Sequence, residues 1–146
     1  MTDYMEIAFD QARAAALRGE VPVGAVLVRD GQVLASAGNE VEATNDPTAH
    51  AEILVIRRAS QAAGEPRLEG ADLYVTLEPC AMCAQAIALS RIRRVYFAAY
   101  DPKGGGVEHG AKVFDHPTCH HRPEVYGGLR ENEAVLMLKE FFQAKR

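Results

Sequence analysis

Two short segments contain residues that can bind a metal ion and move protons. The first is His50-Ala51-Glu52 and the second is Pro79-Cys80-Ala81-Met82-Cys83, each at the start of an expected helix. Cysteines three positions apart on a helix face the same way, and the positive helix end favours the thiolates that bind zinc. His50, Cys80 and Cys83 would supply three ligands and leave the fourth tetrahedral position for water. That is the pattern of a catalytic zinc site.

Glu52 is the residue expected to move protons at this site. Zinc lowers the pKa of a bound water toward about 7, which yields hydroxide at neutral pH. A carboxylate beside the metal can take the proton and deliver it to a ring nitrogen and to the leaving ammonia. The H-x-E triplet combined with P-C-x-x-C is the general signature of zinc deaminases, in which the glutamate is not a ligand. We therefore expect hydrolytic deamination of a nucleobase.

The same residues also have simpler interpretations than a metal site. His50 alone could be a capping or core histidine, and a C-x-x-C pair could be two buried small side chains or a redox pair. A redox pair has no need of His50 or Glu52, so the combination favours catalytic zinc. Cys119 with His120 and His121 could form a second metal site, although a loop whose histidines contact substrate or solvent is preferred.

Alternating helices and strands are expected to position these residues. Turn signals and apolar periodicity predict helices and strands in the following ranges. The helices cover residues 3–18, capped by Thr2, and residues 48–63, 80–90 and 131–144; the strands cover residues 24–29, 32–37, 73–77, 94–100 and 123–126. Residues 101–123 read as a long loop with a short helical turn near 112–114, and Gly104-Gly105-Gly106 lacks the frame of a phosphate-binding loop. The pattern predicts an α/β sandwich with a mixed sheet.

Length and composition set further bounds. A chain of 146 residues with 48% hydrophobic and 25% charged residues fits a single soluble domain, residues 1–146. The apolar stretches are too short to cross a membrane, and the acidic N-terminus does not resemble a secretory signal, so a cytoplasmic location is expected. Three cysteines do not suggest a disulfide framework, and a net charge of −4 gives no global attraction for nucleic acid.

The sequence resembles the bacterial tRNA-specific adenosine deaminases, which belong to the cytidine-deaminase-like superfamily and convert the wobble adenosine (position 34) of an anticodon to inosine. The resemblance covers almost the whole chain and includes Asn39, Phe141-Phe142 and residues 21–28, 46–53, 73–83, 90–95, 101–104 and 120–122. It implies a three-layer α/β/α sandwich with a mixed five-stranded sheet. It also implies one Zn²⁺ per subunit, a homodimer with the active site near the interface, and the tRNA anticodon stem-loop as partner.

The resemblance further implies roles for residues outside the zinc group. Asn39 is expected to hydrogen-bond the flipped base or its ribose. Asp101 and Lys103 are expected to hold the neighbouring nucleotides, with His120 and His121 beside them. Phe141 and Phe142 are expected to shape the RNA-facing C-terminal helix, since RNA loops are commonly recognised by aromatic and charged side chains.

Two alternative functions are compatible with parts of this pattern. A deaminase of free guanine or cytosine would use the same zinc chemistry in a small closed pocket and would not need Asp101 or Lys103. A catalytically silent RNA-binding or structural zinc protein is disfavoured because Glu52 is present. RNA binding by an acidic chain would require basic residues to gather on one face. The alternative is that they are scattered over the surface and solvated. The candidates are Arg91, Arg93, Arg94, Lys103, His120, His121, Arg122, Lys139, Lys145 and Arg146.

Overall fold

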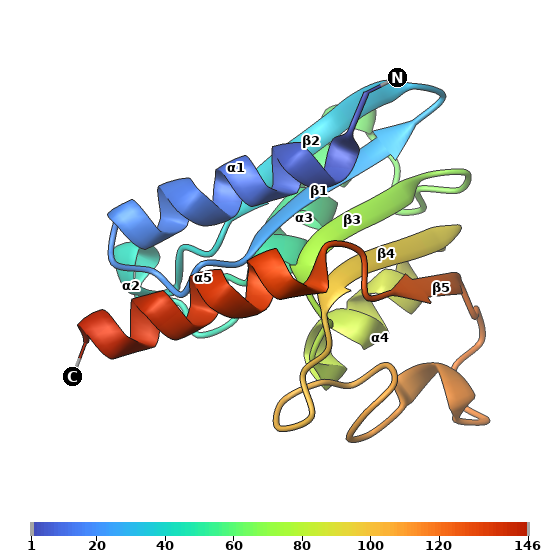
Figure 1. The fold of residues 1–146 in the computed structure, drawn as a ribbon. Helices are drawn as coiled ribbons and strands as arrows, with labels where there is room; N and C mark the ends of the chain where they lie inside the picture. The colour runs from blue at the N-terminus through green and yellow to red at the C-terminus, as the bar shows by residue number, and fades with distance from the viewer. Residues whose placement is uncertain (1, 146) are drawn as a thin grey trace.

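A five-stranded mixed sheet forms the centre of the protein, with the strand order β2-β1-β3-β4-β5 (Figure 1). The computed structural model describes residues 2–145. Strands β1 (Gly24–Arg29) and β2 (Gln32–Gly38) form an antiparallel hairpin. Asp30 and Gly31 connect them with φ values of 52° and 75°, as a tight two-residue hairpin turn requires. Strand β3 (Asp72–Leu77) pairs antiparallel with β1, and β4 (Arg94–Ala99) and β5 (Glu124–Gly127) continue parallel to β3.

Helices cover both faces of the sheet (Figure 1). Helices α1 (Tyr4–Leu17) and α5 (Glu131–Ala144) lie on one face, and α3 (Ala51–Ala63) and α4 (Ala81–Leu89) lie on the other. The side chains of β1 alternate accordingly, so that Val26 packs in the hydrophobic cluster with α1 and Leu27 in the cluster with α3 and α4. The expected three-layer α/β/α sandwich is confirmed.

Two helix starts differ from the sequence predictions. Asp3, rather than Thr2, caps α1, because its carboxylate accepts the backbone N–H of Glu6. The second long helix begins at Ala51 rather than near residue 48, because the Asp46 side chain accepts hydrogen bonds from the backbone and hydroxyl of Thr48 and holds a turn there. A further helix of four residues, α2 (Val41–Thr44), was not predicted because it is too short to show periodicity.

The direction of β5 explains the long connection that precedes it. A parallel strand must start at the same end of the sheet as β4, and Arg94 is indeed aligned with Glu124. Residues 100–123 therefore lead back along the molecule, with a single 3₁₀ turn, η1 (Val113–Asp115), on the way. The return ends where the His121 ring hydrogen-bonds the carbonyl oxygen of Ile92, just before β4 begins. The loop of residues 101–109 thus lies at the carboxyl end of β4, and His121 lies at its amino end.

Arg130 attaches the first turn of α5 to α1. Its guanidinium donates to the carboxylates of Glu6 and Glu133 and lies over the Phe9 ring, 4.5 Å from the centroid. Glu6 also binds Arg13 at 2.8 Å, and the hydrogen bonds from Arg13 and Arg130 lower the pKa of Glu6 to about 2. The N-terminal end of α5 is therefore fixed, while Phe141 and Phe142 near its C-terminal end line the same cleft as His50 and Cys80.

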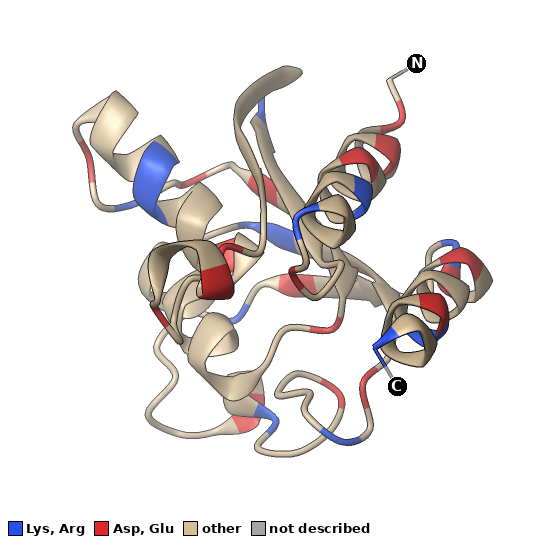
Figure 2. Ribbon diagram, turned by 90° about the vertical axis from the view of Figure 1, so that its left-hand side faces the viewer, with Lys and Arg blue, Asp and Glu red and all other residues tan. Residues whose placement is uncertain are grey.

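Charged residues do not form one basic face. Figure 2 shows Lys and Arg interspersed with Asp and Glu. Several cations of the second half are paired with acids, as in Arg93–Asp72, Arg94–Glu124 and Arg122–Asp115. Four of the basic candidates, Arg91, Arg93, His121 and Arg122, do line one shallow pocket, but Glu69 and Glu124 line it with them. Arg146 is outside the described residues. Within residues 2–145, no helix is both long and apolar enough to cross a membrane.

Candidate active site

The zinc-ligand candidates meet at the adjoining N-terminal ends of α3 and α4. His50 and Cys80 are the residues that directly precede these helices, and both have extended backbone conformations, with ψ values of 151° and 174°. Cys83 lies one turn further along α4 and is buried. Strand β3 leads through Glu78 and Pro79 into Cys80 and the first turn of α4, and residues 80–83 are called the cysteine turn. The sheet therefore sets the position of the two cysteines, and α3 sets that of the histidine.

The distances within this group suit zinc. His50 Nδ1 lies 3.6 Å from the Sγ of Cys80 and 3.6 Å from the Sγ of Cys83, and the three ligand atoms are all within 4.8 Å of one another. In a tetrahedral site with Zn–S near 2.3 Å and Zn–N near 2.0 Å, nitrogen and sulfur are separated by about 3.5 Å. Among residues 2–145 the group has three members. Three protein ligands leave room for water or substrate, as in catalytic zinc sites.

The protonation of the ligands agrees with metal binding. Hydrogen bonds from Cys83 and His50 lower the pKa of Cys80 to about 4, so Cys80 is a thiolate at neutral pH. The hydrogen bond that the Cys83 thiol donates to Cys80, together with burial, raises the pKa of Cys83. The hydrogen bond to Cys80 also raises the pKa of His50. Metal binding therefore releases protons from the site, because both sulfurs and the imidazole must be deprotonated to act as ligands.

Glu52 lies on α3, two residues after His50, and only 4% of it is exposed. Burial raises the pKa of Glu52 to about 7, and the negative charge of Cys80 adds to the effect. A carboxyl group with a pKa near neutrality can both accept and release protons at physiological pH. The environment of Glu52 therefore suits proton transfer beside the three metal-ligand candidates.

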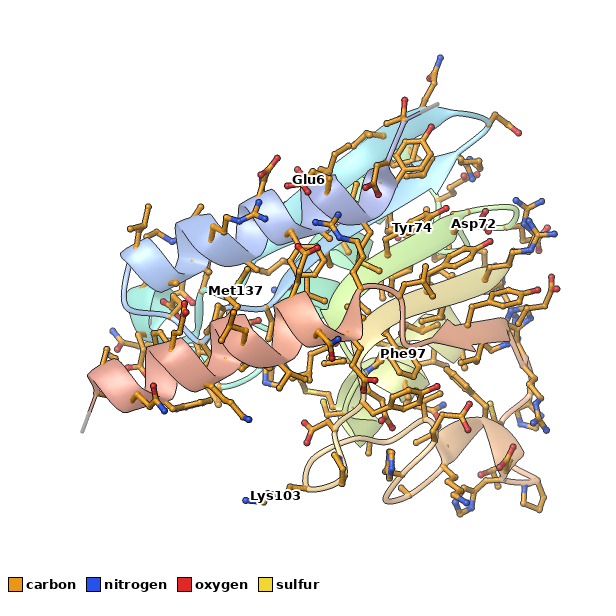
Figure 3. The ribbon with its side chains drawn as sticks, in the orientation of Figure 1. Glu6, Asp72, Tyr74, Phe97, Lys103 and Met137 are labelled. Carbon is orange, nitrogen blue, oxygen red and sulfur yellow. The ribbon has the colours of Figure 1, made fainter. Side chains whose placement is uncertain are left out.

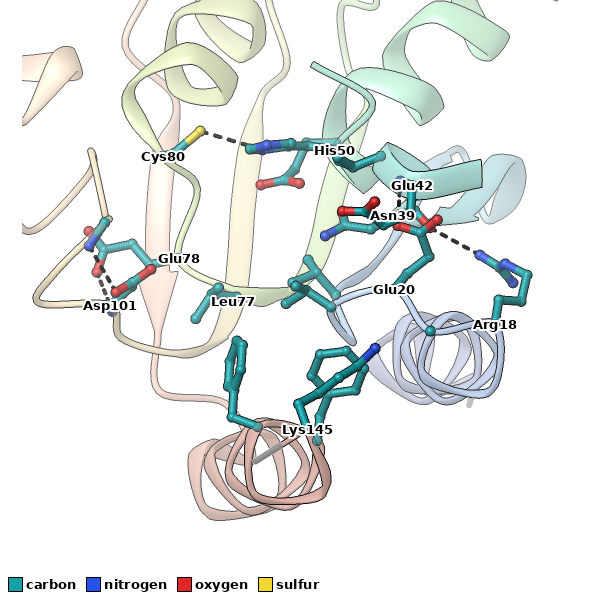
Figure 4. Close-up of a pocket in the computed structure, with 18 residues that line it drawn as sticks. Arg18, Glu20, Asn39, Glu42, His50, Leu77, Glu78, Cys80, Asp101 and Lys145 are labelled. Carbon is teal, nitrogen blue, oxygen red and sulfur yellow. Dashed lines mark hydrogen bonds between the residues drawn. The ribbon is translucent and has the colours of Figure 1, made fainter. Parts of the chain in front are cut away.

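A cleft of about 850 Å³ opens in front of these residues. Figure 4 shows His50 and Cys80 on one side of it and the C-terminal end of α5 on the other. Of the residues singled out in the sequence, the cleft brings together His50, Cys80, Glu52, Asn39, Asp101, Phe141 and Phe142. The adjacent phenylalanines both line it, with Phe142 partly exposed at 48%.

Three of the predicted substrate residues lie elsewhere. Lys103 is at the exposed tip of the 101–109 loop and points away from the body of the protein (Figure 3). The cleft lining includes neither His120 nor His121. The ring of His121 is bound to the Ile92 carbonyl at 2.7 Å, at the far end of β4, because the parallel fifth strand starts there. The roles expected for these three residues stay predictions.

Asn39 is held in one orientation at the cleft. Its Oδ1 accepts the backbone N–H of Ala51 at 2.8 Å and so caps α3, while Arg18 donates to its backbone carbonyl at 3.1 Å. Because the amide oxygen is already used, the NH₂ end of the side chain is turned to the cleft (Figure 4). Asn39 can therefore donate a hydrogen bond to a ligand.

Two buried acids at the cleft were missed by the sequence reasoning. Glu20 accepts the backbone N–H groups of Glu42 and Ala43 and so holds α2, which forms one wall. Glu78 accepts backbone N–H groups from the loop that forms the opposite wall. Each acid lies beside an apolar run, Glu20 before Val21 and Glu78 after β3, and this position is a local signal that could have marked them as candidates.

A family model identifies the general class of enzyme to which the chain belongs. Residues 1–99 match the family model described as the cytidine and deoxycytidylate deaminase zinc-binding region. This segment contains all three ligand candidates and Glu52. The metal group and the family model therefore agree on a zinc-binding deaminase.

Similar proteins define the family more closely. A tRNA-specific adenosine deaminase of Agrobacterium fabrum is 59% identical over 99% of this chain and 95% of that protein, and one of Bacillus subtilis is 48% identical over 98% and 89%. A structure solved in a study of A-to-I editing by tRNA:A34 deaminases has a TM-score of 0.91 and 60% identity, covering 92% of this chain and 98% of that one. A guanine deaminase from Nitrosomonas europaea shares the fold, with a TM-score of 0.76 at 24% identity over 94% and 82% of the two chains. The chain therefore belongs to the family of the tRNA-specific adenosine deaminases.

Proposed function

We propose that the protein hydrolyses adenosine at position 34, the wobble position of a tRNA anticodon, to inosine. The observation that carries the proposal is a three-ligand metal group beside a buried carboxyl group whose pKa is about 7. The family membership supports tRNA as the substrate. A deaminase of free guanine or cytosine remains the second candidate and has the weaker support, since the guanine deaminase resemblance extends only to the fold.

The proposed chemistry replaces the C6 amino group of adenine by oxygen. His50, Cys80 and Cys83 would hold zinc, which when bound supplies a Lewis acid that activates water. Glu52 takes a proton from the attacking water and passes it to the ring nitrogen N1. Glu52 then transfers the second proton to the amino group, so that the C6–N bond breaks and ammonia leaves. Water and adenosine are thus converted to inosine and ammonia without a redox step.

The remaining walls of the cleft are proposed to hold the nucleotide. Asn39 donates a hydrogen bond to the flipped base or its ribose. Phe141 and Phe142 offer aromatic surface to single-stranded RNA, and Arg18 and Lys145 add positive charge at the same cleft. Asp101 lines the cleft and is proposed to hold the nucleotides beside the target base, while its Oδ1 accepts the N–H groups of Lys103 and Gly104 and so holds its loop. A contact from Lys103, His120 or His121 to neighbouring nucleotides is proposed on the resemblance alone.

We further propose that residues 1–146 act as one deaminase domain and that two copies form a homodimer in the cytoplasm. Both hydrophobic clusters share one sheet, which supports a single domain. Helix α4 is almost entirely apolar, yet its last residue, Leu89, is 65% exposed. A helix that is apolar on all sides is usually covered on all sides, which supports a subunit contact there. Sedimentation of the zinc-loaded protein tests the dimer.

The function is tested by offering competing substrates. The zinc-loaded protein is incubated with an anticodon stem-loop carrying A34, with a matched stem-loop carrying G34 and with free guanine and cytosine. Inosine formed only in the A34 RNA supports the proposal. Xanthine or uracil formed from the free bases, with the RNA unchanged, would instead support the second candidate.

A further inference from the structure

Glu78 is a buried carboxylate that the reaction described above does not use. It follows β3 and precedes Pro79 and Cys80, and its side chain has an exposed fraction of 0%. Figure 4 shows it beside Asp101, across the cleft from Glu20 and Asn39. A buried charge is costly unless it is fully hydrogen-bonded, so the contacts of this side chain identify what it holds.

The Glu78 carboxylate gathers five donors from one loop. Its Oε1 accepts the N–H of Asp101 at 3.0 Å and the ring Nδ1–H of His109 at 2.8 Å. Its Oε2 accepts the backbone N–H groups of Val107, Glu108 and His109 at 3.2, 2.9 and 3.0 Å. Both ends of the 101–109 loop are thus tied to one side chain. Four of the five donors are backbone groups, so the contacts fix the path of the loop itself.

The glycine run of this loop fits the same arrangement. A Cβ at Gly105 would collide with the Glu78 carboxylate and with the backbone oxygen of Asp101. A Cβ at Gly106 would collide with the backbone of Cys80 and Ala81, and the Gly106 N–H donates to the Pro79 carbonyl at 2.8 Å. The loop therefore packs its backbone directly on the cysteine turn, which explains the glycines without a phosphate-binding role.

We propose that Glu78 is a positioning residue for substrate binding, which holds the 101–109 loop as the cleft wall that receives the nucleotides beside the target base. The inference rests on the proposed function for its substrate. Glu78 fixes the N–H of Asp101, and the Asp101 carboxylate in turn fixes the N–H groups of Lys103 and Gly104. Asp101 and Gly104 line the cleft, so loss of the Glu78 charge loosens this wall and leaves the three metal ligands in place.

The experiment compares Glu78→Gln with Glu108→Gln in the zinc-loaded full chain. Glu108 lies in the same loop, but its exposed side chain is not part of the cleft lining and only its backbone N–H contacts Glu78, so its variant makes the same chemical change without touching the anchor or the cleft. Amide hydrogen exchange within residues 101–109 should become at least about tenfold faster in Glu78→Gln, because hydrogen bonds to a charged acceptor are lost. KM for the A34 stem-loop should rise about tenfold with kcat within about twofold of the wild type. Zinc content should remain unchanged, and Glu108→Gln should match the wild type throughout.

Opposite results overturn the proposal. Unchanged exchange in the loop, or a fall in kcat with KM unchanged, or loss of zinc would mean that Glu78 does not act by positioning the substrate wall. Should Glu78→Gln fail to fold, Gly105→Ala keeps the Glu78 charge but forces the loop and the carboxylate apart, and it must give the same faster exchange and raised KM. A wild type that forms no inosine overturns the proposed function, while the exchange comparison still decides whether Glu78 anchors the loop.

Discussion

Glu52 lies two residues after His50 and Glu78 lies two residues before Cys80, and both are almost inaccessible to solvent, with whole-residue exposed fractions of 4% and 2%. Their surroundings differ. Few groups donate to Glu52, and burial raises its pKa to about 7. Burial also acts to raise the pKa of Glu78, but the hydrogen bonds from Asp101, His109 and Glu108 outweigh it and lower that pKa. Donors to the charged form thus hold Glu78 as a fixed anion, whereas burial with few donors favours the protonated form of Glu52.

Removing the metal should abolish catalysis at His50, Cys80 and Cys83 without changing the cleft wall that Glu78 holds. Treatment with a chelator is expected to abolish inosine formation, and added Zn²⁺ should restore it, since the activation of water depends on the ion. Zinc content measured by mass spectrometry is the check, with hydrogen exchange in residues 101–109 as the control that should stay unchanged. Full activity in a chain free of metal would contradict the zinc assignment.

Glu52→Gln should distinguish the role of Glu52 from that of Glu78 most clearly. The amide cannot carry protons, so kcat is expected to fall by about 10²–10⁴-fold, the usual contribution of general acid–base catalysis. KM and zinc content should change little, in contrast to the KM effect expected for Glu78→Gln. Steady-state kinetics on the A34 stem-loop provide the measurement. A variant that keeps full turnover would remove Glu52 from the mechanism.

Asn39→Asp tests the wall opposite Glu78. The aspartate can still accept the N–H of Ala51 and cap α3, but it has no NH₂ to donate into the cleft. We expect kcat/KM to fall by about 10–10²-fold with little change in thermal stability, the usual effect of one lost hydrogen bond to substrate. Kinetics and thermal melting distinguish this result from a folding defect. Equal kcat/KM in both proteins would show that the donor is not used.

Glu6, like Glu78, accepts several hydrogen bonds, but it lies at the surface, where 41% of its side chain is exposed. Its pKa is lowered to about 2 by Arg13 and Arg130. Glu6→Gln should cost about 1 kcal/mol of unfolding free energy or less at pH 7, because solvent screens the pairs. The native ion pairs stabilise fully above the unfolded pKa of about 4.5, and that contribution is lost as the pH falls toward 2. Denaturant titrations at pH 7 and pH 2 should therefore show a difference that shrinks in acid, and an equal difference at both would contradict the assignment.

The zinc group and the layers of the fold could be predicted because their signals are local. His50, Glu52 and the C-x-x-C pair lie within two short segments, and the helices and strands that position them show clear apolar periodicity. Helix boundaries were less accurate at Thr2 and near residue 48, where side chains that bond nearby backbone groups decided where each helix begins.

The walls of the cleft could not be predicted in the same way. Glu78 binds N–H groups 23 to 31 positions away, and such contacts leave no periodic trace in the sequence. The position of His121 depends on whether β5 runs parallel or antiparallel to β4, which residue types alone do not specify. An antiparallel fifth strand would have left no long return segment, and this direction is what separates His121 from Asp101.

The parallel fifth strand also indicates where the protein can gain residues without losing its architecture. The return segment is fastened near its start by Glu78 and at its end by His121, with Phe114 buried between them. Residues 116–118 are exposed, and doubling the length of a flexible loop costs only about 0.6 kcal/mol. Insertions at this position should leave the pairing of β4 and β5 intact, so a lineage or a designer can remodel that surface independently of the chemistry.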